Sequence, residues 1–148
     1  MRIDAHDLTQ KVVGVFEAMG SSPSEAELVA ESLVHANLKG HDSHGVGLIA
    51  TYIRHFEDGL LIPNTVATLV KDDGAILMFD GGRGFGRRVG GEAMDAAVAR
   101  CSQTGVVLMT LRNAHHIGRI GAYGEIAMSA GLISIHFVNV TDHQPTVA

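Results

Sequence analysis

The sequence predicts an α/β protein in which a three-helix segment precedes a mixed layer of strands and helices. Apolar residues recur at helical spacing through about residue 58, short runs rich in branched residues follow Pro63, and helical and strand-like patterns alternate beyond residue 86. With 148 residues, 46% of them apolar and 18% charged, the composition is that of a globular chain able to bury a core. We expect two parts, a helical part over residues 1–63 and an α/β part over residues 64–148.

Two helices are predicted at the start of the chain. The first carries an apolar stripe and is expected to end at Gly20, which tolerates a left-handed backbone. The second combines an N-cap serine at Ser22, a proline at the first helical position and a capping-box glutamate at Glu25. Its apolar positions continue to about Lys39, and Gly40 supplies the stop.

A third helix is predicted to begin near His44, with the short side chain of Ser43 or Asp42 as its cap, and to stop at Gly59. On such a helix four residues would form one stripe: His44, Leu48, Tyr52 and His55. The positive end of the helix dipole would favour an anionic ligand such as a carboxylate beside this stripe. A capped helix with a surface histidine fits the same spacing equally well.

Strands and helices alternate in the second half of the chain. The predicted elements are a β-hairpin over residues 66–70 and 75–79 with a turn at 72–74, a helix over 89–103, a buried strand over 106–111, a helix over 121–130 and a strand over 132–140. The residues after the last strand form a proline-containing loop with no element to cover the sheet. This pattern indicates that the chain is the first part of a larger domain.

Charge and hydropathy argue against two classes of partner. The formal charge is −5 and no run of Lys or Arg occurs, so the phosphate neutralisation on which nucleic-acid binding depends is missing. No apolar run approaches the roughly 18 residues of a membrane span, and the first residues lack an apolar signal segment. We therefore expect a cytoplasmic protein that binds neither nucleic acid nor membrane.

The glycine-rich run at residues 81–86 (GGRGFG) lies between a predicted strand and a predicted helix, as in dinucleotide-binding folds. Its spacing differs from the G-x-G-x-x-G fingerprint, because counting from Gly84 the last position is Val89. The acidic residue that should end the next strand is also absent, and Arg112 stands there. The sequence therefore predicts a fold other than the Rossmann fold, in which the glycines permit a tight turn and close helix packing.

A second histidine cluster, residues 113–118 (NAHHIG), follows the predicted strand 106–111, at the edge where α/β proteins commonly bind ligands. Imidazole changes charge near neutral pH, so His116 and His44 are candidates for acid–base chemistry, although an ordinary loop histidine fits the position of His116 as well. The nine histidines follow no recognised metal-ligand spacing, and no metal site is predicted. A small metal-dependent hydrolase is the alternative class of enzyme.

Motifs far apart in the chain keep a fixed order: residues 40–46 (GHDSHGV), Tyr52, residues 59–63 (GLLIP), Asp80 with its glycines, and residues 116–123 (HIGRIGAY). In order and spacing they resemble the type-2 malate/L-lactate dehydrogenase family. This family also includes ureidoglycolate, sulfolactate and other 2-hydroxycarboxylate dehydrogenases. The resemblance covers nearly the whole chain.

The resemblance implies an oxidoreductase that interconverts a 2-hydroxy acid and a 2-oxo acid with NAD or NADP, on a non-Rossmann fold. His116 matches the family's catalytic histidine, which would take the hydroxyl proton while a hydride leaves to the nicotinamide. His44 would hold the substrate, with Ser43 ordering the helix start and Tyr52 lining the same stripe. Asn139 and Thr141 match the strand end that approaches the cofactor in the family.

One substrate-binding position, Leu48, departs from the family pattern. Several members carry an arginine there, whose guanidinium grips a substrate carboxylate through two hydrogen bonds. Because leucine makes no such bond, Leu48 favours a bulkier or less polar substrate, such as an aryl pyruvate.

Family members are more than twice as long as this chain. The resemblance therefore implies the N-terminal part of such a dehydrogenase, truncated and inactive by itself. The family forms dimers, so we expect a homodimer, or a companion chain that carries the remaining C-terminal half. A non-catalytic remnant is a further possibility.

Overall fold

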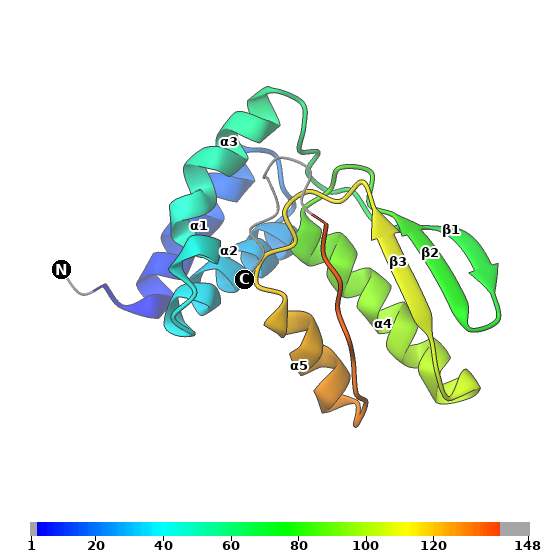
Figure 1. Cartoon of the computed structure of the whole chain (residues 1–148). Helices are drawn as coiled ribbons and strands as arrows, with labels where there is room; N and C mark the ends of the chain where they lie inside the picture. Colours follow the sequence, from blue (N-terminus) through cyan, green and yellow to red (C-terminus); the bar gives the residue numbers. More distant parts are fainter. Residues whose placement is uncertain (1–2, 140–148) are drawn as a thin grey trace.

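A computed structural model describes residues 3–139 and contains a group of helices beside a small mixed sheet (Figure 1). The elements in chain order are α1 (Ala5–Ala18), α2 (Pro23–Leu38), two 3-10 turns (Asp42–His44 and Val46–Leu48), α3 (Ile49–Glu57), β1 (Thr68–Asp73), β2 (Ile76–Asp80), α4 (Gly86–Thr104), β3 (Leu108–Arg112) and α5 (Gly121–Ser129). The order confirms the predicted α/β class with its helical first part. No helix among residues 3–139 is long and apolar enough to cross a membrane.

The first two helices form as the sequence predicts. Asp4 caps α1 by accepting hydrogen bonds from the backbone N–H groups of His6 and Asp7. Ser22 caps α2 by accepting from the N–H of Glu25, and Pro23 occupies the first turn. The facing apolar stripes of the two helices form one core cluster with residues from α3 and from the chain before α4: Val12, Phe16, Met19, Ala26, Val29, Ala30, Leu33, Tyr52, Leu61 and Phe85.

The start of the predicted third helix is wrong. Gly45 has an extended backbone that separates the two 3-10 turns, and the α-helix begins only at Ile49. A side chain at Gly45 would overlap the Asn37 side chain, whose oxygen accepts from the N–H of Val46 at 2.9 Å. Asn37 therefore holds this segment close to α2, and a continuous helix does not fit there.

The predicted caps of the third helix are also wrong. Asp42 accepts a hydrogen bond from the Asn37 side chain, and the Ser43 hydroxyl bonds to Nδ1 of the neighbouring His44 at 2.9 Å. Neither the two 3-10 turns nor α3 has a side chain that caps its N-terminus. The sequence identifies the polar residues correctly, but their partners come from tertiary structure.

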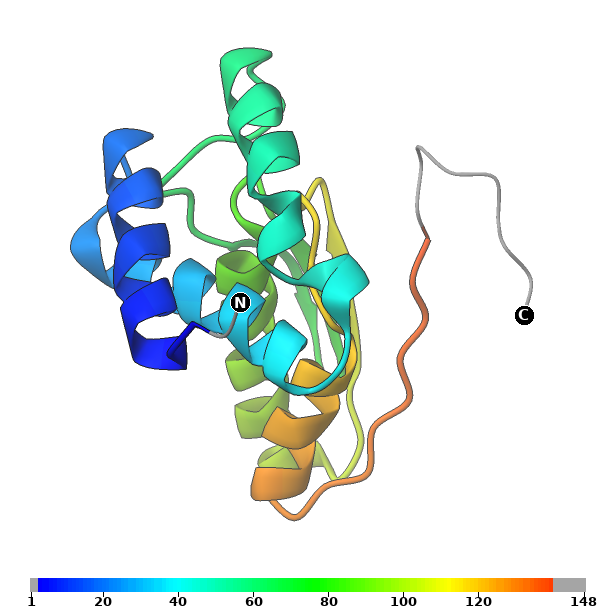
Figure 2. The same ribbon diagram turned by 90° about the vertical axis from the view of Figure 1, so that its left-hand side faces the viewer.

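The predicted hairpin is confirmed, with β1 antiparallel to β2, and β3 adds to β2 in parallel. The turn is shifted, because Asp73 pairs with Ile76 and only two residues lie between them. Leu77 and Phe79 are buried against Ala93 of α4. Figure 2 shows α4 on one side of the sheet and the chain after α5 on the other.

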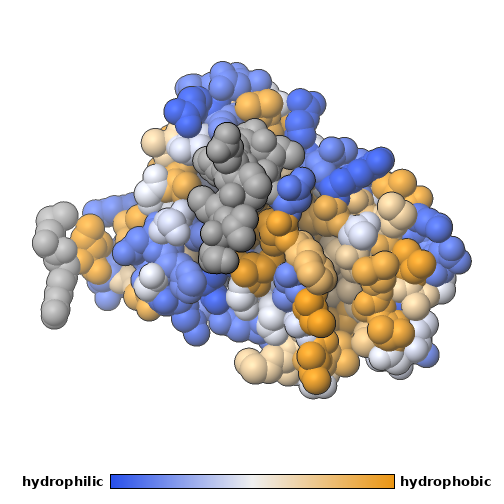
Figure 3. All heavy atoms as spheres, in the orientation of Figure 1, coloured by the Kyte–Doolittle hydropathy of each residue, from blue (hydrophilic) through white to orange (hydrophobic). Residues whose placement is uncertain are grey.

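The outer face of the sheet is uncovered within the described residues. Ile76, Met78 and Leu108 are exposed there, the last by 60%. The prediction that residues 106–111 form a buried strand is therefore wrong for one face of β3. In Figure 3 hydrophobic side chains gather over this part of the surface and along the chain that follows α5.

The predicted strand over residues 132–140 is not present in the described part, which ends at Asn139. Its alternating apolar side chains project away from the molecule, with Ile133, Ile135 and Phe137 exposed by 99%, 80% and 93%. Leu132 packs against the cluster around Tyr123, and the His136 ring lies 6.5 Å from the Tyr123 ring, while the backbone of the segment runs along the other side of the sheet from α4 (Figure 2). The sequence pattern is that of a strand, but no strand among residues 3–139 pairs with it.

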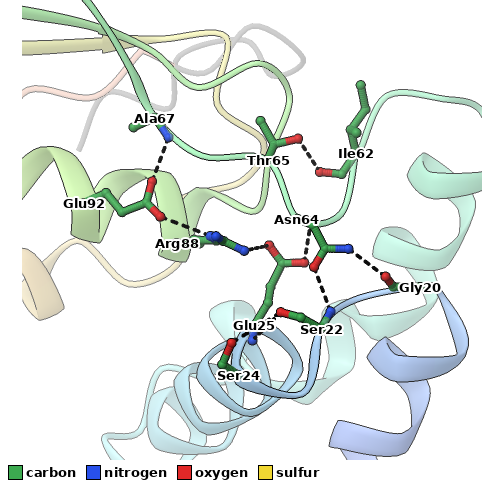
Figure 4. A network of polar contacts seen from close by, with 10 residues as sticks. All are labelled: Gly20, Ser22, Ser24, Glu25, Ile62, Asn64, Thr65, Ala67, Arg88 and Glu92. Carbon is green, nitrogen blue, oxygen red and sulfur yellow. Dashed lines mark hydrogen bonds and ion pairs between the residues drawn. The ribbon is translucent and has the colours of Figure 1, made fainter.

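A buried glutamate joins the helical part to the α/β part (Figure 4). The Glu25 side chain is completely inaccessible to solvent, and one of its oxygens accepts from Nη1 of Arg88 on α4 at 3.1 Å. Its other oxygen accepts from the backbone N–H of Asn64 at 2.7 Å. Arg88 also pairs with Glu92, which accepts from the N–H of Ala67 at 2.7 Å. The network fixes the chain before β1 between α2 and α4.

The same network replaces one of the two hydrogen bonds of the predicted capping box, while the bond from the N–H of Glu25 to Ser22 forms as predicted. In a capping box Glu25 would accept from the N–H of Ser22. Here the Asn64 side chain accepts from that N–H at 2.7 Å and donates to the carbonyl of Gly20 at 2.7 Å. Because Asn64 accepts the hydrogen bond from the N–H of Ser22, the Glu25 carboxylate is available to pair with Arg88.

Glu25→Ala should lower the free energy of unfolding by about 3 kcal/mol, because Arg88 and the N–H of Asn64 lose a buried acceptor. Glu27→Ala, at an exposed site on the same helix, is the matched control and should change stability by no more than about 0.5 kcal/mol. Urea unfolding followed by circular dichroism measures both. Equal losses in the two variants would contradict a special role for Glu25.

Candidate active site

The two histidine clusters of the sequence meet between α3 and the chain that leaves β3. Asp80 at the end of β2 supports this place by accepting from the N–H of Gly82 at 2.9 Å and from the Asn113 side chain at 2.8 Å. These hydrogen bonds, first of all that from Gly82, hold the pKa of Asp80 below its usual value. Asn113 has a left-handed backbone, which asparagine tolerates, and it turns the chain toward α3.

Residues 113–118 are held by the glycine-rich loop. The N–H of His115 donates to the carbonyl of Gly84 at 3.0 Å, and the N–H of Arg83 donates to the carbonyl of Asn113 at 2.6 Å. A side chain at Gly86 would overlap the carbonyl oxygens of both His115 and His116. The predicted close packing of the glycines is confirmed, and its effect is to press the first turn of α4 against the histidine segment.

His116 lies between two side chains of the other cluster. The Tyr52 hydroxyl and Nδ1 of His116 are 2.8 Å apart and form a hydrogen bond. The His44 ring stacks on His116 with centroids 5.4 Å apart and an interplanar angle of 29°. The structure thus brings together His44, Tyr52 and His116, which the sequence placed in two separate regions.

The Nε2 atoms of His44 and His116 are available to a ligand. Neither atom forms a hydrogen bond with a described residue, and neither is among the buried polar atoms that lack a partner. Both rings are half-buried. The Nε2 atoms are therefore accessible, while the Nδ1 atoms of His116 and His44 bond to Tyr52 and Ser43.

A second histidine pair lies behind the first. His55 Nδ1 and His115 Nε2 are 2.8 Å apart, and the His115 ring meets the Tyr52 ring edge-on at 4.9 Å. The sequence predicts no separate role for either residue. The available signals were the double histidine at 115–116 and the position of His55 on the stripe with Tyr52.

Burial keeps the central side chains uncharged. It lowers the pKa of His116 to about 4, and the nearby His44 adds to this effect. It also lowers the pKa of His115 to about 4, with contributions from His55 and His116. Burial raises the pKa of the Tyr52 hydroxyl well above its usual value. At neutral pH both imidazoles are therefore neutral and able to accept a proton.

The remaining predicted site residues lie at different places. Ser43 is exposed beside His44, and Leu48 packs against the core of the helical part. Asn139 is exposed at the end of the described residues. Thr141 lies outside the described residues.

No group of three or more His, Cys, Asp or Glu side chains in the described chain is arranged to hold a metal ion. An open pocket of about 380 Å³ lies elsewhere, between α2, α4 and α5, and is bordered by Arg87, Gly118 and Arg119. None of the four rings at positions 44, 52, 55 and 116 borders it. The pocket, which His35 also borders, is therefore separate from the site formed by His44, Tyr52 and His116.

Comparison with known proteins places the chain among dehydrogenases. The profile of the malate/L-lactate dehydrogenase family matches residues 3–148. Hydroxycarboxylate dehydrogenase B of Escherichia coli O157:H7 is 46% identical over 139 residues, which are 94% of this chain and 38% of the relative. L-lactate dehydrogenase of Cupriavidus necator is 36% identical over all 148 residues, which correspond to 42% of its length.

Solved structures give the same result. A candidate malate/lactate dehydrogenase from E. coli superposes with a TM-score of 0.86 at 44% identity, covering 88% of this chain and 37% of that one. Sulfolactate dehydrogenase from Methanocaldococcus jannaschii gives a TM-score of 0.83 at 32% identity, covering 87% and 38%. The chain thus spans about two-fifths of the length of the relatives it matches.

Gly86→Ala should destabilise the protein by about 2 kcal/mol, because the new methyl group overlaps two carbonyl oxygens that cannot both move aside. Gly91→Ala on the same helix is the control. A side chain there meets only Arg87, at an ordinary contact distance of 3.7 Å. Because alanine has a higher helix propensity than glycine, Gly91→Ala should raise stability by up to about 1 kcal/mol. Thermal unfolding distinguishes the two, and a similar gain in both would contradict the close contact.

Acidification from about pH 6.5 to about pH 4 should destabilise the protein. The unfolded chain, in which histidine has a pKa of about 6.5, binds protons in this window that the folded His115 and His116 do not bind, so the free energy of unfolding falls as the pH falls. Thermal unfolding between pH 7.5 and pH 4 measures the slope. His116→Gln should make the slope shallower, and an unchanged slope would contradict the low pKa of His116.

Proposed function

The chain belongs to the malate/L-lactate dehydrogenase family, and we propose that it supplies the proton-transferring and substrate-binding side of an enzyme that interconverts a 2-hydroxy acid and a 2-oxo acid with NAD or NADP. The observation that carries the proposal is the hydrogen bond between Tyr52 and Nδ1 of His116, with His44 stacked on the same imidazole. It leaves the Nε2 atoms of two stacked imidazoles without a hydrogen-bond partner among the described residues.

His116 is the proposed base of the oxidative direction. With Nδ1–H donating to the Tyr52 oxygen, the Nε2 lone pair of His116 is free to take the proton of the substrate hydroxyl. The low pKa of His116 keeps this lone pair available at neutral pH. A bound nicotinamide would supply the acceptor for the hydride from C2 of the substrate. Removal of the hydroxyl proton as C2 is oxidised avoids a charged alkoxide.

His44 is the proposed substrate-holding group. Its Nδ1 is held by Ser43 at 2.9 Å, and its ring is stacked on that of His116 with centroids 5.4 Å apart. Leu48 packs on the helical core and offers no charge to the substrate carboxylate. These features support a 2-oxo acid with a large apolar group, such as an aryl pyruvate.

The described residues fit only part of a cofactor site. His44 and His116 provide the place at which a 2-hydroxy acid and a nicotinamide would meet, and Asn139 and Thr141 are proposed to approach the cofactor from the end of the chain. Because the chain spans about two-fifths of its relatives, further cofactor contacts are proposed to come from residues equivalent to the rest of their length. The proposed assembly in the cytoplasm is a homodimer, or a complex with a companion chain that carries those residues.

A chimera tests this function. The segment of this chain that matches E. coli hydroxycarboxylate dehydrogenase B, 139 residues at 46% identity, replaces the corresponding segment of that enzyme. The chimera should oxidise NADH or NADPH in the presence of 2-oxo acids, with phenylpyruvate preferred to oxaloacetate. His116→Gln should lower kcat by about 100-fold to 10,000-fold, because the base is lost.

Two controls accompany the chimera. His6→Gln, at an exposed histidine of α1, should leave kcat unchanged, and the 148-residue chain by itself should show no turnover. Full turnover of the His116→Gln chimera would overturn the role of His116. A clear preference for oxaloacetate would overturn the proposed substrate class alone.

A further inference from the structure

The second histidine pair takes no direct part in the proposed proton transfer, yet it lies against it. His55 and His115 are 60 positions apart and are joined by a hydrogen bond of 2.8 Å. Among the described residues, this bond and that between Tyr52 and His116 are the two side-chain hydrogen bonds that connect α3 to residues 113–118. Each member of this pair is next to a member of the other bond: His115 directly precedes His116, and His55 lies about one helical turn after Tyr52.

Tyr52 is held by its ring as well as by its hydroxyl. It is 4% exposed, and its ring lies 6.2 Å from that of Phe16 and 6.0 Å from that of Phe85. The His115 ring completes this surrounding at 4.9 Å with an interplanar angle of 85°. His55 in turn meets His115 edge-on at 5.1 Å. A displacement of His115 would therefore open space beside Tyr52.

The bond between His55 and His115 has a defined direction. Nδ1 of His115 is buried without a partner, and a buried N–H without an acceptor is rarer in proteins than a buried acceptor without a donor. The proton of the neutral ring is therefore on Nε2, which donates to Nδ1 of His55. The remaining hydrogen-bonding capacity of His115 is unused, so its orientation depends on His55.

We propose that His55 and His115 are positioning residues, whose hydrogen bond fixes Tyr52 beneath His116 and thereby keeps the imidazole of His116 oriented and shielded from water. The proposal rests on the proposed function of His116, but it concerns geometry within this chain. The charged and titratable groups that face the pair are Tyr52, His116 and, through His116, His44. Loss of the bond would let water reach His116 from behind, which raises its pKa because the neutral form is favoured by burial.

Nuclear magnetic resonance of the 148-residue chain with ¹⁵N-labelled histidine tests the proposal, since it reports the hydrogen bonding at Nδ1 and the pKa of each ring. His55→Leu should raise the pKa of His116 by about one unit toward the value of a free histidine and change its Nδ1 chemical shift. His55→Asn, whose amide reaches the position of Nδ1, should retain the pKa and shift of the parent. His6→Leu is the control for removal of an unrelated histidine and should change neither.

The outcomes separate positioning from mere stabilisation. If His55→Leu lowers the melting temperature while the pKa and Nδ1 shift of His116 stay at parent values, the proposal is overturned. Should His55→Leu fail to fold, His55→Gln, which displaces the amide by one bond, gives the same comparison with His55→Asn. Because no cofactor or substrate is present, these results stand apart from turnover of the chimera, where full activity of His116→Gln would refute the proposed function and not the positioning.

Discussion

The contact between Gly86 and the carbonyl oxygens of His115 and His116 is the steric constraint on which the site depends. A helix begins at Gly86 with its backbone against a second backbone, an approach that only a residue without Cβ allows. The contact sets the distance between the histidine segment and the first turn of α4. The hydrogen bond from the N–H of His115 to Gly84 fixes its register. Together they direct the His116 side chain toward α3.

The other half of the site is placed by a polar network. α3 packs on α1 and α2 through apolar side chains, and α2 is joined to α4 through Glu25 and Arg88. Since the start of α4 also contacts His115 and His116, the positions of both histidine clusters depend on this one helix. A completely buried carboxylate is costly unless it is paired, and the hydrogen bonds from Arg88 and Asn64 offset that cost. The network therefore makes the relative position of the two parts specific.

The chemistry proposed for the site follows from burial. Burial and the nearby His44 keep His116 neutral, and a neutral imidazole held at Nδ1 presents one nitrogen for proton exchange. The same burial makes the fold sensitive to acid. The exposed apolar side chains of the sheet and of residues 132–139 show that the described residues leave apolar surface uncovered, in agreement with the partial coverage of the longer relatives.

The sequence by itself determined the features that depend on neighbouring residues. Helical periodicity gave α1, α2, α4 and α5, the N-cap at Ser22 was read from one short motif, and the hairpin followed from branched runs around Gly74. The spaced motifs around His44 and His116 indicated the family. Tertiary structure decided what depends on residues far apart in the chain. The hydrogen bond between Asn37 and Val46 prevents the third helix from starting near His44. The N–H of Ser22 bonds to Asn64 in place of Glu25, and His55 bonds to His115, which is 60 positions away in the chain. Residues 132–139 carry the alternation of a strand but have no described partner, because pairing of strands requires a neighbour that periodicity does not reveal.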